Sequence, residues 1–357
     1  MFAVHFSFHY MSFSTNILNW YHQHKRDLPW RNTRDPYLIW LSEIILQQTR
    51  VDQGLPYYLK FSEQYPNVVA LAKASEEKVM RLWQGLGYYS RARNLHAAAK
   101  DVVARFGGKF PSSYEEIRSL KGIGEYTAAA ISSFAFDQPY PVVDGNVFRL
   151  LSRYYGISDP IDKPKTKKIF TELAGDLMKG FPPHDFNQAI MEFGARQCKP
   201  ASPDCSNCPL NLSCHAYKLN LVSTLPVKEN KTKVRDRFFH YLIIESKNSF
   251  YIRKRNEKDI WQGLHDFPLI EAKKKITPAS FIKSKELGAY SKEITFTTIS
   301  EPYEHLLSHQ KIHARFYHFS EKDLADKKLL HPLIKVNLKT ITKYALPKLV
   351  ERYLDGK

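Results

Sequence analysis

Residues 120–131 read Leu-Lys-Gly-Ile-Gly-Glu-Tyr-Thr-Ala-Ala-Ala-Ile, and this stretch decides how we interpret the fold. It lies between two segments of helical character, the first of which begins at the capping-box sequence Ser112-Ser-Tyr-Glu115. Two helices joined by Gly122-Ile-Gly124 expose backbone N–H groups at a helix N-terminus, where a phosphate can approach closely. Such a contact is independent of base sequence. An ordinary helix–turn–helix corner is the alternative for Gly-x-Gly on its own.

Around this hairpin the chain divides into regions of different character. Helical apolar spacing, interrupted by Gly and Pro, predicts an all-α domain over residues 13–218, with helices over 78–86 and 91–106. Residues 219–234 are polar and predict an exposed linker. We expect a multidomain protein whose second domain, residues 235–357, is α+β. Its predicted elements are strands at 238–244, 250–253, 294–299 and 312–319 and a helix over 338–353.

The composition favours a polyanion as the binding partner. The chain has 53 Lys and Arg against 36 Asp and Glu, a formal net charge of +17. Its apolar runs are shorter than the roughly 20 residues of a membrane helix. The aromatic residues 1–11 lack the basic start and long apolar stretch of a signal peptide. We therefore expect an intracellular protein that binds a polyanion and has no membrane contact.

All four cysteines of the chain lie in one short segment, as Cys198, Cys205, Cys208 and Cys214. Disulfides are disfavoured because the chain looks intracellular and has enough apolar residues for a core. Zinc prefers paired short spacings, whereas here a single x2 pair is flanked by x6 and x5. Four thiolates in one compact loop can hold a 4Fe–4S cluster. We favour a structural cluster, with zinc and unliganded thiols as the alternatives.

Two carboxylates lie in apolar surroundings. Asp35 and Pro36 begin a helix in which Leu, Ile and Trp surround Glu43, so burial would raise its pKa and suit it to general acid catalysis. A Glu that reaches water at the helix edge is the alternative. Asp144 is placed as a helix N-cap, which holds a carboxylate rigid and ionised. A neutral acid and a fixed carboxylate form a glycosidase arrangement, and in a DNA-binding protein the base must leave the stack to reach it.

Further motifs resemble those of one enzyme superfamily. They are Leu28-Pro-Trp-Arg31, Leu41-Ser-Glu-x-x-Leu-Gln-Gln-Thr49, Gly85-Leu-Gly-Tyr-Tyr-x-Arg-Ala-Arg93, Val143-Asp-Gly-Asn-Val147, the glycine hairpin and the four cysteines. Over residues 15–215 the chain resembles the helix-hairpin-helix, iron–sulfur DNA glycosylases. It is most similar to the branch that removes adenine mispaired with 8-oxoguanine. The resemblance implies a monomer that acts on double-stranded DNA containing A:8-oxoguanine or A:G mispairs.

The resemblance also implies a role for each matching position. Glu43 would protonate adenine and help to activate water, and Asp144 would stabilise the sugar cation. Tyr126 and Asn146 would position these groups. Gly122 and Gly124 would hold DNA phosphate, in this family often with a bound monovalent or divalent cation. Arg31 would be a further DNA contact. Gln48 and Tyr88 would wedge into the duplex around the lesion, and Thr49 and Leu86 would contact 8-oxoguanine.

The C-terminal region resembles the Nudix-like, 8-oxoguanine recognition domain of the same family, through Trp261-Gln-Gly-Leu-His-Asp-Phe-Pro268. The glutamate-rich Nudix signature is absent, so pyrophosphate hydrolysis is not expected. Leu307-Ser-His309 matches the lesion-recognition loop, in which Ser308 would hydrogen-bond 8-oxoguanine and His309 would help to detect it. Leu307 replaces the usual phenylalanine, which puts a stacking role there in doubt. A polar loop between strands is the alternative.

Tyr126 separates two branches of the superfamily, because the bifunctional branch has a lysine there that forms a Schiff base with the sugar. A tyrosine cannot do so, and we expect a monofunctional glycosylase. Two other functions remain open from the sequence. One is a glycosylase/lyase acting on oxidised pyrimidines, and the other is a non-catalytic iron–sulfur DNA-binding regulator.

Overall fold

The computed structural model describes residues 2–230, 234–290 and 294–356. The chain forms two compact units, one of Met1–Lys73 with Asn94–Lys231 and the other of Ala74–Arg93 with Thr232–Lys357. The sequence predicts one continuous helical region over 13–218, since local spacing does not report which unit a helix contacts. None of the described helices is long and apolar enough to cross a membrane.

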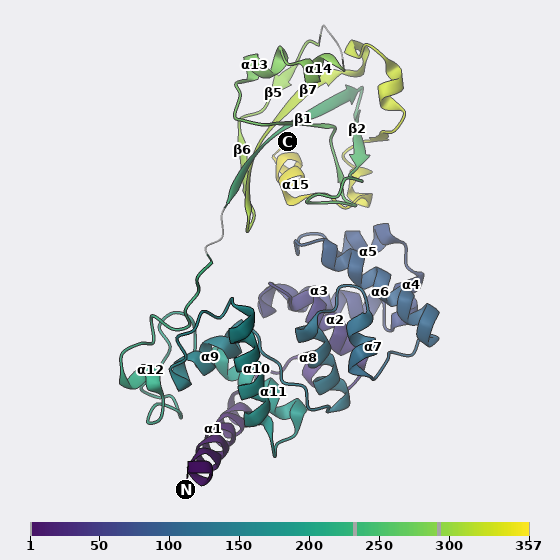
Figure 1. Cartoon of the computed structure of the whole chain (residues 1–357). Coiled ribbons are helices and arrows are strands. Elements are labelled where there is room, and N and C mark those ends of the chain that lie inside the picture. Colours follow the sequence, from purple (N-terminus) through teal and green to yellow (C-terminus); the bar gives the residue numbers. More distant parts are fainter. Residues whose placement is uncertain (1, 231–233, 291–293, 357) are drawn as a thin grey trace. The chain divides into compact units, whose positions relative to one another are not determined.

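The first unit is entirely helical over its described residues, which confirms the all-α prediction (Figure 1). Its elements are α1 Phe2–His24, η1 Pro29–Arg31, α2 Pro36–Leu46, α3 Val51–Gln64, α4 Val68–Lys73, most of α6 Ser90–Phe106, α7 Tyr114–Ser119, α8 Glu125–Phe136, α9 Gly145–Tyr155, α10 Pro164–Met178, α11 Pro183–Arg196 and α12 His215–Lys218.

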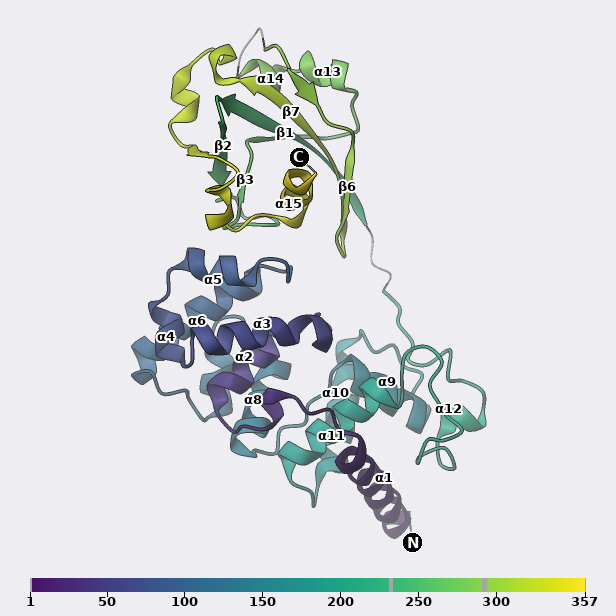
Figure 2. The same ribbon diagram turned by 180° about the vertical axis from the view of Figure 1, so that it is seen from behind.

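Two groups of helices make up this unit. In one, α2 packs against α3 and α8, as Figure 2 shows. In the other, α1 packs against α10 and α11, and α9 packs against α11. The core of the second group is apolar and aromatic, with Phe13, Leu151, Phe170 and Phe193 fully buried. Helices α8 and α11 are in contact and join the two groups.

Side-chain caps fix where the helices next to the site begin. Asp35 accepts a hydrogen bond from the Tyr37 backbone N–H, with Pro36 in the first turn, as predicted for the start of α2. The capping box before the hairpin lies one residue later than predicted. Its cap is Ser113, whose hydroxyl accepts from the Glu116 N–H. Ser112 is not the cap, because the local sequence offers two adjacent serines and the helix begins at Tyr114.

The second unit contains α5 Glu76–Trp83 and a mixed sheet. Strand β1 pairs in parallel with β7, and all other described pairs are antiparallel. The sheet elements are β1 Arg235–Ser246, β2 Ser249–Lys254, β3 His265–Asp266, β4 Leu269–Ala272, β5 Thr298–Ile299, β6 Tyr303–Leu306, β7 Gln310–Ser320 and β8 Ile334–Val336, accompanied by α13 Pro278–Ile282, α14 Lys285–Gly288 and α15 Lys348–Asp355.

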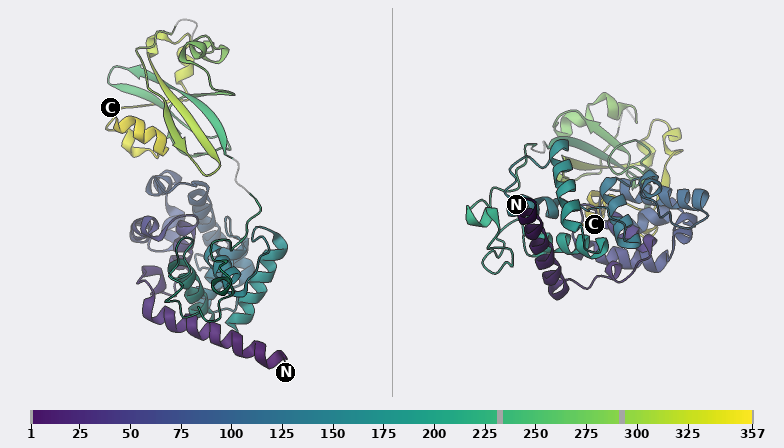
Figure 3. Two further views of the ribbon diagram at one scale, coloured as in Figure 1. Left: turned by 90° about the vertical axis from the view of Figure 1, so that its left-hand side faces the viewer. Right: turned by 60° about the horizontal axis from the view of Figure 1, so that its bottom comes forward.

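Alternating side chains of β1 and β7 give the sheet two covered faces. Leu242 and Tyr317 pack with Phe281 of α13 on one face. Phe316 stacks on Tyr353 of α15 on the other, with ring centroids 3.6 Å apart. Figure 3 shows these helices on opposite sides of the strands. The burial of both faces explains why these two strands read as nearly continuous apolar and aromatic runs.

Two predictions in this unit were wrong in extent. The strand predicted at 294–299 is paired as a strand only at Thr298–Ile299, because Phe296 packs into the core instead of continuing the ladder. The helix predicted over 338–353 begins only at Lys348. Pro347 directly precedes it and disfavours helical backbone at the residue before it, so residues 338–346 form turns and a short 3₁₀ helix, Ile341–Lys343.

Candidate active site

A cavity of about 440 Å³ lies in the first unit, at the place where α2, α8, α9 and α11 meet. Its volume suits a small planar ligand such as a base. It brings together the four predicted catalytic residues and two predicted DNA contacts, Arg31 and Thr49, although they come from distant parts of the chain. The residues relevant to its chemistry are Arg26, Trp30, Arg31, Glu43, Tyr126, Asp144, Asn146, Gln188 and Glu192.

Glu43 lies on α2 and is 8% exposed, as the apolar helix sequence predicts. Burial raises the pKa of its carboxyl from 4.5 to about 7, and the nearby negative charge of Asp144 acts in the same direction. A hydrogen bond from Tyr126 and the positive charge of Arg31 oppose the rise. A carboxyl with this pKa is substantially protonated at neutral pH and can act as a general acid.

Tyr126 is held in the first turn of α8, two residues after Gly124, the N-cap of that helix. Burial raises the pKa of its phenol well above 10, and the charge of Glu43 adds to this effect. The hydroxyl therefore stays protonated and donates a hydrogen bond to the Glu43 carboxyl group. The next residue, Thr127, accepts a hydrogen bond from the Gln47 side chain, which ties α8 to the end of α2.

Asp144 is the N-cap of α9, as predicted. Its Oδ1 accepts from the backbone N–H groups of Asn146 and Val147, both at 2.8 Å, and its Oδ2 accepts from the Asn146 side chain at 2.7 Å. Burial raises the pKa of this carboxyl, and these three hydrogen bonds offset the rise only in part. The expected fixed orientation is present, and the donors that favour the anion work against substantial desolvation.

Arg149 orients Asn146 and was missed in the sequence. Its Nη2 donates to the Asn146 Oδ1 at 2.8 Å and to the Gly194 carbonyl at 2.7 Å, while its Nε donates to the Cys198 carbonyl at 2.8 Å. The approach is close, since a Cβ at Gly194 would lie 2.7 Å from the Asn146 carbonyl oxygen. The arginine thereby connects the carboxylate of the cavity to the cysteine segment.

A further carboxylate in the cavity, Glu192 of α11, was also not predicted from the sequence. It makes ion pairs with Arg26 at 2.6 Å and with Arg31 at 2.8 Å, and Arg31 also donates to Gln188 at 3.0 Å. Burial alone would raise the pKa of Glu192, but the hydrogen bonds and charges of the two arginines lower it to about 2. The signal that could have found it is an acidic residue inside the apolar stretch Ala189–Phe193.

The two glycines of the hairpin are explained by different structural features. Gly122 has φ +83°, and a Cβ there would lie 2.7 Å from the Asn94 Cβ, so its backbone needs glycine. Gly124 has an extended backbone as the N-cap of α8, and no atom lies within 4 Å of where its Cβ would be. Open space beside a helix N-terminus suits the approach of a phosphate.

The four cysteines are half-buried free thiols that line one small cavity together with Leu150, Arg153, Phe193 and Leu210. Within the described ranges, no three His, Cys, Asp or Glu side chains are arranged to hold a metal ion. Four thiols facing one mainly apolar cavity nevertheless form the donor set that a 4Fe–4S cluster uses. Arg153 donates to the carbonyls of Lys199 and Pro200 and anchors the segment to α9.

The predicted wedges are both strained at the backbone. Gln48 follows α2 and has φ 55°, and Tyr88 lies between Gly87 and α6 with φ 47°. Such left-handed conformations are uncommon for residues other than glycine and tend to mark functional positions. Both side chains are exposed, and Thr49 is half-buried. Leu86 is buried, so its predicted contact with 8-oxoguanine would require the local chain to move.

The predicted recognition residues Leu307, Ser308 and His309 form the turn of the β6–β7 hairpin. In the second unit they line a cavity of about 560 Å³ with Leu86, Tyr88 and Trp261, and the Tyr88 and Ser308 hydroxyls are hydrogen-bonded. Ser308 and His309 are exposed, and Leu307 is half-buried. The exposed apolar side chain of this turn is its neighbour Leu306, at 72%, which sequence reasoning missed.

Comparison with known proteins extends over both units. Residues 41–175 match the HhH-GPD superfamily of base excision DNA repair proteins, and residues 240–356 match the NUDIX domain. An adenine DNA glycosylase of Buchnera aphidicola (from Acyrthosiphon pisum) is 35% identical over 349 residues, covering 96% of this chain and 97% of that protein. The adenine DNA glycosylase of mouse is 46% identical over 217 residues, 58% of this chain and 42% of that protein.

Solved structures agree for the helical part. A thermostable thymine-DNA glycosylase is 33% identical with a TM-score of 0.54, covering 58% of this chain and 95% of that one. A non-covalent endonuclease III–DNA complex, 22% identical with a TM-score of 0.50, shows the same fold over 58% of this chain and 94% of that one. Since a relative of nearly equal length shares 35% of its residues, the chain belongs to the adenine DNA glycosylase family of base excision DNA repair enzymes.

Proposed function

We propose that this enzyme excises adenine mispaired with 8-oxoguanine, or with G, from double-stranded DNA, by hydrolysis and without strand cleavage. The observation that carries the proposal is the cavity of about 440 Å³ in which a buried Glu43, with a pKa of about 7, faces the fixed Asp144. Relatives of similar length are adenine DNA glycosylases, which supports the choice of base.

The two carboxyl groups divide the chemistry between them. Adenine flipped into the cavity receives the Glu43 proton on a ring nitrogen, so the base leaves as a neutral molecule with the glycosidic electron pair. The sugar becomes an oxocarbenium-like cation, which the Asp144 carboxylate stabilises. Water then adds to the sugar carbon, and Glu43 takes back a proton from that water. The proton balance closes, and Glu43 is ready for another cycle.

Tyr126 and Asn146 are the positioning residues. The Tyr126 hydroxyl donates to Glu43 and fixes the carboxyl that must reach the base. The Asn146 amide, held by Arg149, donates to Asp144 and keeps its charge turned toward the sugar. Tyr126 also supports a monofunctional reaction, since its hydroxyl offers no amine for a Schiff base.

Recognition of the opposite base is assigned to the second unit. Leu307, Ser308 and His309 lie in one turn beside Tyr88, and the NUDIX match covers that turn. The domain of residues 235–357 would read 8-oxoguanine, and the domain of residues 13–218 would carry the chemistry. Gln48 and Tyr88 would open the duplex around the lesion, with Thr49 and Leu86 contacting 8-oxoguanine and Arg31 contacting the flipped nucleotide.

Two further groups are proposed as ligands. A 4Fe–4S cluster on Cys198, Cys205, Cys208 and Cys214 would supply four thiolate bonds that staple a loop with little packing of its own. A monovalent or divalent cation at Gly122 and Gly124 would help to hold a DNA phosphate at the start of α8. In both cases the role is to place the protein on the duplex.

The test is single-turnover adenine release from duplexes with A opposite 8-oxoguanine, G or T, with Glu43→Gln as control. Fast release from the first duplex, slower release from the second and none from the third or from the variant is expected. A fourth duplex, containing an oxidised thymine, addresses the other branch. Activity on that duplex alone would refute adenine specificity.

A further inference from the structure

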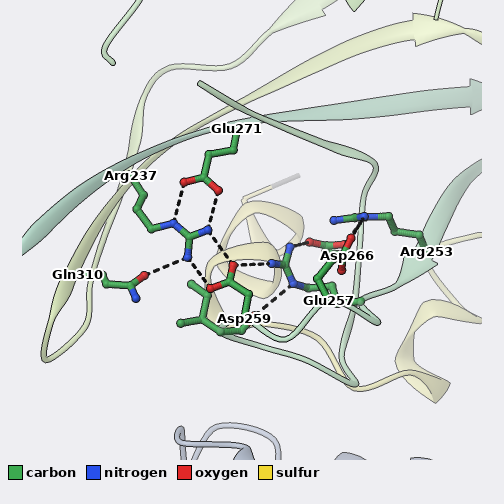
Figure 4. A network of polar contacts seen from close by, with 9 residues as sticks. Arg237, Arg253, Glu257, Asp259, Asp266, Glu271 and Gln310 are labelled. Atoms are coloured by element: carbon green, nitrogen blue, oxygen red, sulfur yellow. Dashed lines mark hydrogen bonds and ion pairs between the residues drawn. The ribbon is translucent and has the colours of Figure 1, made fainter. Parts of the chain in front are cut away.

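Arg237 of β1 lies at the centre of a polar network in the second unit, shown in Figure 4. Its side chain is 8% exposed. Nε and Nη2 donate to the two Glu271 oxygens at 2.8 and 2.6 Å, and Nη1 and Nη2 donate to the two Asp259 oxygens at 2.9 and 2.7 Å. Nη1 also donates to Gln310 Oε1 at 3.1 Å. All five N–H donors of the guanidinium are therefore used inside the protein, and none remains for DNA phosphate.

One end of this network holds a strained turn. Asp259 also receives a hydrogen bond from Arg255 at 3.3 Å, and Arg255 forms an ion pair at 2.6 Å with Asp266, which is 0% exposed. Between them lies Trp261, whose φ of 61° is unusual for a bulky residue. The surrounding structure must determine such a backbone, and the ion pairs on either side of it do so.

The other end holds the recognition turn. Gln310 is the first residue of β7 and directly follows His309. Its carbonyl accepts the Leu307 N–H at 2.8 Å, which closes the turn, and its side chain accepts from Arg237. The His309 carbonyl accepts from the Arg235 N–H at 3.0 Å, two residues before Arg237 on β1.

The two ends face the same cavity. Trp261 forms one wall, and its ring centroid lies 5.7 Å from that of His305 on β6, the strand that enters the recognition turn. Arg237 lies over the Phe239 ring, which in turn packs edge-on against Trp261. The wall and the turn are thus joined through one guanidinium that lies behind both of them.

We propose that Arg237 is a positioning residue for recognition of the base opposite adenine, acting through Gln310 and Asp259 without touching DNA. The inference rests on the proposed function, in which Leu307, Ser308 and His309 read 8-oxoguanine. Preference for 8-oxoguanine over G then depends on the geometry that Arg237 imposes, whereas the excision chemistry in the first unit does not.

Three variants of the full-length holoenzyme test this. Arg237→Lys keeps the charge but cannot make two bidentate pairs. Gln310→Leu removes only the link to the recognition turn, and Gln310→Glu restores an acceptor there. Arg253→Lys is the matched control, because Arg253 contacts Asp266 and Glu257 at the far side of the network and does not contact the recognition turn.

The readout is the ratio of single-turnover rate constants on A:8-oxoguanine and A:G duplexes, with Tm measured alongside. We expect Arg237→Lys and Gln310→Leu to lower this ratio by roughly tenfold, the worth of one good base contact. The rate on A:G should stay unchanged, Gln310→Glu should recover most of the ratio, and Arg253→Lys should keep it.

The possible outcomes distinguish the proposed lesion preference from the proposed role of Arg237. Equal wild-type rates on the two duplexes would refute the proposed lesion preference, and the inference with it. A wild-type preference that survives in Gln310→Leu would overturn the role of Arg237 alone. If Arg237→Lys lowers Tm, Gln310→Leu decides, since it removes a single hydrogen bond at the edge of the network.

Discussion

Replacing Glu43 with Gln should abolish adenine release and at the same time stabilise the protein above neutral pH. Gln keeps the shape of the side chain and an oxygen that accepts from Tyr126, but it never carries a charge. In the wild type, burial raises the pKa of Glu43 from 4.5 to about 7. The ionised carboxylate is therefore less stable in the folded protein than in the unfolded chain.

The direction and size of this difference in the free energy of unfolding follow from proton linkage. Below pH 4.5 both states bind the proton, and the buried acid has no linkage cost. Between pH 4.5 and 7 the unfolded chain has released the proton while the folded protein still binds it, so folding stability falls steadily as the pH rises from the unfolded pKa to the folded pKa. Above pH 7 the loss reaches its full value of about 3 kcal/mol. For the helical unit, of roughly 200 residues, that corresponds to a Tm difference of roughly 6–12 °C in favour of the variant.

The assay is thermal unfolding of wild type and Glu43→Gln side by side between pH 5 and 8.5, reported as the difference in Tm. Taking the difference cancels the titration of all other groups. Glu63→Gln, on the exposed end of α3, is the matched control for the substitution itself. A Tm difference that does not grow with pH, or a variant less stable than wild type at pH 8, would refute the assigned protonation of Glu43.

Four other results are expected. Tyr126→Phe should move the alkaline limit of single-turnover activity to higher pH, because it removes a hydrogen bond that favours the ionised form of Glu43; an unchanged pH profile would contradict this. Borohydride should trap no protein–DNA adduct with wild type, and a stoichiometric adduct would show lyase chemistry. Cys208→Ser should lose the brown chromophore expected of anaerobically purified protein and lower the Tm, whereas stoichiometric zinc in wild type would exclude the cluster. Gly124→Ala should lower duplex affinity severalfold while Tm changes by only a few degrees, since its Cβ meets no protein atom but would meet a phosphate; binding titrations at fixed salt measure this.

Local chemistry explains which parts of the fold were predictable from sequence. The starts of α2 and α9 follow from Asp35 and Asp144, whose side chains bond backbone N–H groups two or three residues away. Strands β1 and β7 follow from their β-branched and aromatic residues. The prediction for the end of the chain was wrong because apolar spacing over 338–353 is compatible with a helix, whereas the helix begins only after Pro347.

Residues of the site that depend on long-range contacts could not be found in the same way. Glu192 meets Arg26 and Arg31 across more than 160 residues, and Arg149 meets Cys198 across 49. In sequence, Arg149 is an ordinary charged residue on an amphipathic helix, and Glu192 stands out only as an acidic residue in an apolar stretch, with no sign of its partners. The register of β1 with β7 pairs Arg235 with Gln310 and so brings the Arg237 side chain within reach of the Gln310 side chain, and this register is equally unknown before the strands pair. Motifs identify the residues that are proposed to touch substrate, whereas the residues that hold them in place require the structure.

Three of the carboxylates that line the cavity, Glu43, Asp144 and Glu192, show why those partners matter. They share one desolvated space, so burial pushes the pKa of each upward, and the donors around each decide the outcome. Glu192 meets two guanidinium groups and has its pKa lowered to about 2. Asp144 has three N–H donors that oppose the effect of burial. Glu43 has a single phenolic donor, and its pKa rises to about 7. In the proposed reaction Glu43 can serve as the acid because one donor opposes its burial, and a cation paired with Glu43 would lower its pKa as the two arginines lower that of Glu192.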